Sequence, residues 1–229
     1  MPRETLDQKI QHLIDQILTL DSMIEQTTLA AVDALKRRDI KAAQILYAYD
    51  DQVNAKRFDI ENECMATIAT QQPVMAKDLR LLASILEIVG ELERIGDYAK
   101  GISKICILIG NEPHVKPLID IPRMAEIAVS MLHRAIGAFI SGDIETARAI
   151  PEQDDEVDAL YNQVYRELVS LILVDPQKID RANHLMWAAH NLERMADRVT
   201  NICERTIYVK TGELKEIKSS DDEIQQIKS

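Results

Sequence analysis

The strongest constraint on the fold is a motif that occurs twice, at an interval of 100 residues. The segment 91-ELERIGDYAKGI-102 is matched by 191-NLERMADRVTNI-202, with Leu, Glu, Arg, Asp and Ile at the same places. Two further pairs of segments match at an offset of 104 residues: 39-DIKAA-43 with 143-DIETA-147, and 50-DDQV-53 with 154-DDEV-157. The sequence therefore predicts a tandem duplication, and the fall from 104 to 100 predicts a loop four residues shorter in the second copy.

Both copies are predicted to be helical. Gly, Pro and aromatic residues are scarce, whereas Ala, Leu, Ile, Glu, Lys and Arg dominate, and this composition is typical of packed helices. Breaks at Pro and Gly separate six expected helices, at residues 4–38, 40–69, 74–109, 120–140, 143–173 and 177–211. We therefore predict an all-α fold of two tandem, pseudo-symmetric three-helix bundles. The first repeat is expected at 1–110, the second at 118–212, and a polar tail at 213–229.

Charge and composition exclude several classes of protein. The net charge of -11 argues against a nucleic-acid binder, because such proteins neutralise phosphates with clustered Lys and Arg. Cys64, Cys106 and Cys203 show no CxxC spacing, so neither disulfides nor a zinc site are indicated. The chain does not start like a signal peptide, and the apolar segments 81–89 and 105–110 are too short to span a bilayer. We expect a cytoplasmic protein without direct membrane insertion.

Each copy of the repeated motif places two carboxylates on one face of a helix. Glu93 precedes Asp97 by four residues, and Glu193 precedes Asp197 by the same interval, so each pair is adjacent on its helix. Apolar residues at helical spacing lead up to both glutamates, which places them at or beside an inward seam. Because like charges at this spacing destabilise a helix, a positive charge is expected close to each pair.

The preceding helix of each bundle supplies a second pair of oxygen-bearing side chains. Counting residues outward from the intervening turn places the two pairs of each bundle level on antiparallel helices, within about 1.5 Å of rise. Clusters of oxygen ligands suit hard cations such as Mg²⁺ and Mn²⁺, and also iron. His190 is left out, because position 90 is Gly. The predicted metal ligands are Glu93, Asp97, Asp50 and Asn54 in the first bundle, and Glu193, Asp197, Asp154 and Asp158 in the second.

Two other interpretations of these carboxylates remain open. Acidic pairs are common on helix surfaces, and Arg94 or Arg194 could neutralise a carboxylate on a neighbouring helix, which would leave a metal-free helical scaffold. Clustered cations could also activate water for hydrolysis of phosphate esters, which would make the chain a carboxylate-bridged metalloenzyme. No Ser, Cys or His stands in a nucleophile arrangement, and the ExxH motif of di-iron helices is absent, so no catalytic residue is predicted.

The motifs 91-ELERIGDYA-99, 191-NLERMADRVTNICE-204 and 78-DLRLLASI-85 closely resemble those of the PhoU family. The resemblance extends to about residue 212 and implies two symmetric three-helix bundles, with multinuclear metal clusters bound in some members by repeated E(D)xxxD motifs. Asn54 departs from that pattern and removes one negative charge, so weaker metal binding is expected in the first bundle.

The resemblance also implies a function. PhoU proteins are cytoplasmic accessory proteins, often homodimers, that couple the ABC phosphate transporter and its ATPase to a phosphate-sensing histidine kinase. They act as negative regulators of the phosphate-starvation response and catalyse no known reaction. The expected function of this chain is therefore a metal-binding helical adaptor in phosphate homeostasis.

Overall fold

The fold is built from helices, and none of the described residues lies in a strand. The structure is a computed structural model that describes residues 2–71 and 74–217. The first half contains α1 (Pro2–Arg37), α2 (Ile40–Thr70) and α3 (Ala76–Ile109). The second half contains α4 (Asp120–Ser141), α5 (Ile144–Ala149), α6 (Asp154–Val174) and α7 (Ile179–Thr211), with 3₁₀ turns at Ile150–Gln153 and Pro176–Lys178. The predicted all-α class is confirmed.

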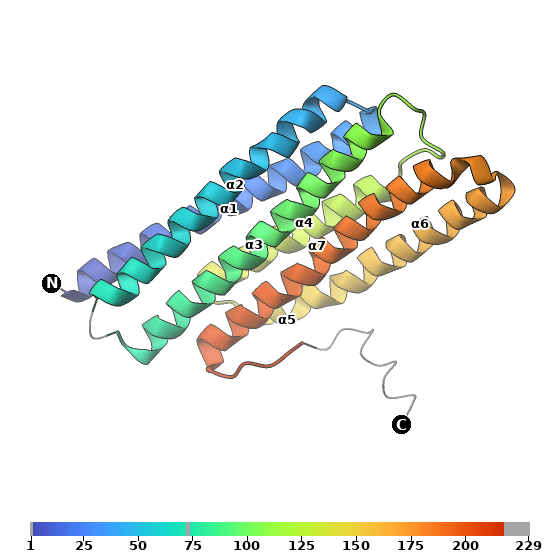
Figure 1. Cartoon of the computed structure of the whole chain (residues 1–229). Coiled ribbons are helices and arrows are strands. Elements are labelled where there is room, and N and C mark those ends of the chain that lie inside the picture. The colour runs from blue at the N-terminus through green and yellow to red at the C-terminus, as the bar shows by residue number, and fades with distance from the viewer. Residues whose placement is uncertain (1, 72–73, 218–229) are drawn as a thin grey trace.

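The helices form two three-helix bundles that lie side by side. Figure 1 shows α3 and α7 next to each other at the centre, with α2 and α6 at the outer sides and α1 and α4 behind. Helix α3 packs along α7 and α1 packs against α4, so the buried apolar side chains of both bundles form one continuous core. The prediction of two bundles is confirmed. The expected repeat limits stay predictions, and most of the expected tail lies outside the described residues.

The helix expected over 143–173 is interrupted, and that part of the prediction was wrong. Pro151 lies in the first turn of the 3₁₀ segment between α5 and α6. Because proline has no N–H and its ring clashes with the preceding turn, it cannot continue an α-helical ladder. Helix α6 therefore begins at Asp154, and its first turn carries Asp154, Asp155 and Glu156. The positive end of the helix dipole stabilises negative charge at this place.

One pair of repeated segments marks the same helix start in both bundles. Asp39 accepts a hydrogen bond from the backbone N of Ala42 at 3.0 Å, and Asp143 accepts one from Thr146 at 3.1 Å. These are N-cap contacts, which satisfy backbone donors that lack an intrahelical partner. The preceding residue has a positive φ in both copies, 59° at Arg38 and 68° at Gly142. The repeat thus conserves a turn whose left-handed residue is glycine only in the second half.

The α3–α7 contact repeats two positions around a pseudo-twofold axis. Positions 91 and 191 are equivalent, as are 101 and 201, and the two helices run antiparallel (Figure 1). Buried Glu91 accepts a hydrogen bond from Asn201 of α7 at 3.1 Å. At the matching place, Gly101 lies so close to Asn191 that an added Cβ would be 2.8 Å from its amide nitrogen. A glycine is needed there because the helices approach closely.

Helix α4 is long and apolar enough to cross a membrane by length and composition, with a mean hydropathy of 1.2 over its most apolar window. In the structure 56% of that window is buried. The apolar face of α4, including Met124, Met131 and Ile136, packs into the shared core. A core helix meets the same hydropathy criterion, and the packing of α4 is that of a core helix.

The same Gly→Ala substitution should have opposite effects at two nearby positions. Gly137 is exposed within α4, and a Cβ there would meet nothing within 4 Å, so Gly137→Ala should raise the free energy of unfolding by about 0.5–1 kcal/mol. Gly142 ends α4 with a φ of 68°, so Gly142→Ala should lower it by about 1–2 kcal/mol. Urea unfolding followed by circular dichroism measures both changes. Two changes of the same sign would contradict the assigned end of α4.

Candidate metal centres

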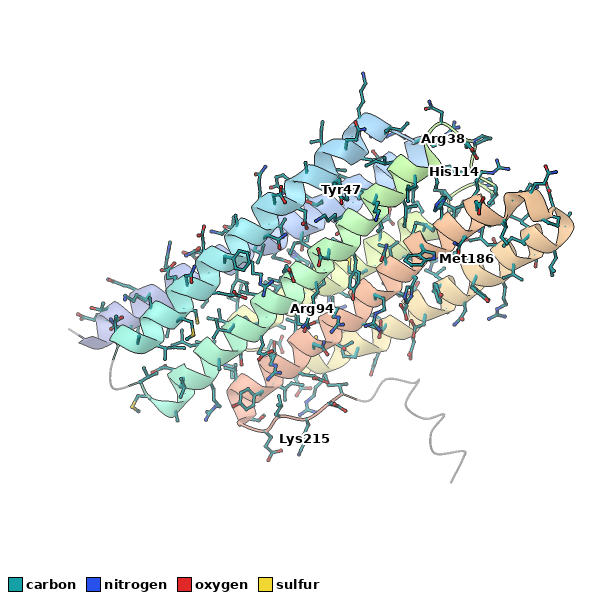
Figure 2. All side chains as sticks on the ribbon, viewed as in Figure 1. Arg38, Tyr47, Arg94, His114, Met186 and Lys215 are labelled. Atoms are coloured by element: carbon teal, nitrogen blue, oxygen red, sulfur yellow. The ribbon has the colours of Figure 1, made fainter. Side chains whose placement is uncertain are left out.

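The first candidate cluster lies between α2 and α3, and a lysine of the protein occupies its centre. Asp50 is buried, with 3% of its surface exposed. Its Oδ2 accepts hydrogen bonds from the Nζ of Lys100 at 2.7 Å and from the Nδ2 of Asn54 at 2.8 Å. The ammonium of Lys100 also lies 5.3 Å from the ring centroid of Tyr47, which Figure 2 labels on α2. The hydrogen bond to Asp50 raises the pKa of Lys100.

An arginine neutralises the other half of this cluster. Glu93 forms an ion pair with the Nη1 of Arg57 at 2.9 Å, and Arg57 reaches back to Glu61 on its own helix. Asp97 is exposed, and partial desolvation followed by the charge of Asp50 raises its pKa. The structure therefore brings the four predicted ligands of the first bundle together, as their level positions on antiparallel helices predicted. It also brings two cations of the chain to the same place.

The second candidate cluster lies between α6 and α7 and contains four carboxylates. Asp154 is buried, with 3% of its surface exposed, and burial raises its pKa to about 7. The charges of Asp158, Asp197 and Glu193 raise it further, so all four predicted ligands of the second bundle face one another. Among the described residues, the Oδ1 of Asp154 has no hydrogen-bond partner. A buried carboxylate in this position requires a positive charge nearby.

The positive groups next to the second cluster lie on α7 itself. The Nδ1 of His190 is 3.1 Å from the Oε2 of Glu193, and Arg194 pairs with Asp197 at 2.9 Å. Both contacts join residues three positions apart along the helix. In the first bundle Arg94 likewise pairs with Glu91 of its own helix, at 2.6 Å. The two arginines that the sequence offered as neutralising groups for a neighbouring helix are therefore not used in that way.

The two clusters differ at three equivalent positions, and each difference changes the charge. The repeat offsets match Arg57 with Tyr161, Lys100 with Thr200, and Asn54 with Asp158. Both cations of the first cluster are thus replaced by neutral residues in the second, and the amide is replaced by a carboxylate. Four carboxylates around a buried, orphaned oxygen form a donor set that fits a hard cation such as Mg²⁺, Mn²⁺ or iron. In the first cluster the Lys100 ammonium already neutralises Asp50.

Sequence reasoning missed Lys100 and Arg57, although a local signal was available. Lys100 lies three residues after Asp97, and Arg57 lies three residues after Asn54, so each cation shares a helix face with a predicted ligand. Comparing the two repeats position by position would have shown that neither cation has a charged counterpart. The signal for a difference between the two sites was therefore present in the duplication.

Comparison with known proteins identifies the family to which this fold and these clusters belong. The family model of the PhoU domain matches twice, at residues 17–106 and 121–206, so one match falls in each bundle. The chain belongs to the PhoU family. Its PhoU relatives include the phosphate-specific transport system accessory protein PhoU homolog of Clostridium acetobutylicum, 32% identical over 93% of this chain and 97% of that protein. The homolog of the same name in Aquifex aeolicus is 36% identical over 91% and 94%.

Solved PhoU structures have the same architecture. The phosphate transport system regulatory protein PhoU from Streptococcus pneumoniae superposes with a TM-score of 0.85 at 27% identity, covering 93% of this chain and all of that one. PhoU from Pseudomonas aeruginosa also gives a TM-score of 0.85, at 32% identity over 90% of this chain and 99% of the other. The resemblance found in the motifs is confirmed over nearly the full length of the chain.

Removing the built-in cation of the first cluster should destabilise the protein. Lys100→Met would leave the Asp50 carboxylate buried without its ammonium and should lower the free energy of unfolding by about 2–3 kcal/mol. Adding Asp50→Asn should restore most of that loss, because the amide carries no charge to neutralise. Lys104→Met, at an exposed position one turn along α3, should change stability by less than about 0.5 kcal/mol. Urea unfolding of the four proteins at low divalent-cation concentration tests the cycle, and additive losses in the double variant would contradict it.

Proposed function

We propose that this protein is a regulatory accessory protein of phosphate uptake. The observation that carries the proposal is the pair of PhoU-domain matches, which accounts for both bundles and leaves no further domain within residues 17–206. The relatives named above are described as accessory or regulatory proteins of phosphate transport, and they match over more than nine-tenths of their length. A relationship over this extent favours the same role for the whole chain.

An adaptor without catalytic turnover fits the chemistry of the side chains. The three cysteines are buried, and burial raises the pKa of Cys64 to about 11 and that of Cys203 to about 12, so both stay protonated thiols at neutral pH. Neither candidate cluster presents a serine or cysteine nucleophile beside a base. The relatives' names likewise describe accessory and regulatory proteins rather than enzymes. These features support regulation and disfavour the metallohydrolase alternative.

The second cluster is the proposed resident metal site. Asp154 and Asp158 from α6 with Glu193 and Asp197 from α7 would hold one or more hard cations, with iron, Mn²⁺ and Mg²⁺ as the candidates. A bound cation would neutralise carboxylates that otherwise repel one another and would join the start of α6 to α7. The first cluster, with Lys100 and Arg57 in place, would bind such a cation more weakly.

The proposed partners follow from the family and from the charge of the chain. They are the ABC phosphate transporter, through its ATPase, and a phosphate-sensing histidine kinase, with the protein acting in the cytoplasm as a homodimer. A net charge of -11 would favour basic patches on those partners, and the association rate should therefore fall as salt rises. The regulatory outcome is repression of the phosphate-starvation response while phosphate is plentiful.

Metal binding should be lost from one bundle and not from the other. Glu193→Gln combined with Asp197→Asn should lower the affinity of the second cluster for Mn²⁺ by about 100-fold or more, because two ligands lose their charge. The equivalent double variant in the first bundle, Glu93→Gln with Asp97→Asn, serves as the matched control and should retain most of the bound metal. Elemental analysis of untagged protein and Mn²⁺ titration followed by electron paramagnetic resonance measure the difference.

Either of two results would contradict this assignment. If the variant of the second bundle binds as much metal as the parent, Glu193 and Asp197 are not ligands. If the control loses an equal share, Lys100 and Arg57 do not take the place of a cation in the first cluster. Far-ultraviolet circular dichroism should show that both variants keep their helices, since the substitutions remove like charges at adjacent helix positions.

Deleting the gene should leave the phosphate-starvation response active in cells grown with ample phosphate. A reporter fused to a starvation-induced promoter measures this, and co-purification from crosslinked cells should recover the transporter ATPase or the histidine kinase. The metal-loaded protein should show no turnover of phosphate esters. Normal repression in the deletion strain would refute the regulatory role, and metal-dependent hydrolysis lost with Glu193→Gln would instead establish an enzyme.

A further inference from the structure

A third group of metal-ligating side chains lies between the two bundles, on the helices behind α3 and α7 in Figure 1. It consists of Asp21 and Glu25 of α1 and His133 of α4, and the ligand atoms of all three lie within 4.8 Å of one another. Asp21 and Glu25 are four residues apart and therefore share a helix face. The first bundle supplies the carboxylates and the second supplies the imidazole.

The buried member of this group, Asp21, has an oxygen without a partner. Only 4% of the surface of Asp21 is exposed, and its Oδ1 has no hydrogen-bond partner among the described residues. Burial, followed by the nearby charge of Glu25, raises the pKa of this carboxyl, and His133 opposes the shift. A carboxylate placed among core residues is costly unless a positive group neutralises it. The orphaned oxygen therefore marks a position that a cation would satisfy.

The spacing of the other two ligands suits a small metal ion. The Nδ1 of His133 lies 3.1 Å from the Oε1 of Glu25. Two ligands bound tetrahedrally at about 2.1 Å from one ion are about 3.4 Å apart, so the two atoms need to move by only a few tenths of an ångström. One imidazole nitrogen with two carboxylate oxygens is a donor set that zinc accepts, and a water molecule can complete the coordination at the exposed side.

We propose that Asp21, Glu25 and His133 form a Zn²⁺ site that joins the two bundles. The site is distinct from both carboxylate clusters, since it lies on α1 and α4 and contains an imidazole where the others offer only oxygen ligands. A metal bound here bridges the two halves directly, because no single helix carries all its ligands. The proposal does not depend on the regulatory function or on the occupancy of the cluster between α6 and α7.

A second pair of histidine and glutamate provides the control. The Nε2 of His12 lies 3.5 Å from the Oε2 of Glu63, and both side chains are partly exposed, at 62% and 34%. This pair joins α1 to α2 within one bundle and does not belong to a group of three ligands of the kind that surrounds His133. His12→Gln therefore removes an exposed imidazole next to a carboxylate without touching the proposed site.

The test is a Zn²⁺ titration of the full chain, untagged and freed of metal with a chelator. The background carries Glu193→Gln and Asp197→Asn, so that zinc bound near His190 does not obscure the result. His133→Gln should remove one equivalent of bound Zn²⁺ or weaken it by about tenfold or more, and Asp21→Asn should do the same. His12→Gln should leave the stoichiometry unchanged. Calorimetry gives the stoichiometry and affinity, and circular dichroism confirms that the variants fold.

Nuclear magnetic resonance of the five imidazoles provides a readout that a purely structural role would not change. One equivalent of Zn²⁺ should shift the Nδ1 resonance of His133 and fix its ring with the proton on Nε2, while His12 stays unaffected. Unchanged zinc stoichiometry in both His133→Gln and Asp21→Asn would overturn the proposal. So would an Nδ1 resonance of His133 that does not respond to zinc, or an equal loss of zinc in His12→Gln.

Discussion

The packing of α3 along α7 is the contact on which the rest of the molecule depends. It is held partly by a buried glutamate, since Glu91 of α3 accepts a hydrogen bond from Asn201 and lies 3.5 Å from the guanidinium of Arg198, both on α7. The pseudo-symmetric counterpart is the close approach of Gly101 to Asn191. Because this contact sets two bundles side by side, their apolar faces merge into one core, and α1 comes to lie against α4.

This arrangement explains where the charged clusters are found. Each carboxylate cluster forms between the central helix of a bundle and its outer neighbour, because antiparallel helices joined by a short turn place equivalent levels opposite each other. The third group, with His133, exists only because α1 and α4 meet across the bundles. The first two sites therefore belong to the repeat unit, and the third belongs to the pair.

That difference also explains what could be predicted from the sequence. The duplicated motif and the helical spacing were sufficient for the fold class, the two bundles and the grouping of the eight predicted ligands. The interruption at Pro151 was missed, although it decides that Asp154 begins a helix. Asp21 and His133 are 112 residues apart and meet only through packing between bundles, so no local pattern could have joined them. Long-range packing, more than helix formation, was the part that the sequence did not reveal.

The lysine at the centre of the first cluster has a consequence for how the two halves respond to their surroundings. Lys100 is a counter-ion that belongs to the chain, so it can neither dissociate nor be exchanged for another ion. Stabilisation by a freely diffusing ligand depends on its concentration, whereas stabilisation by a tethered group does not. The first bundle thus keeps the same charge balance whatever ions the solution contains. The second bundle, with Thr200 at that position, has its balance set by what the solution supplies.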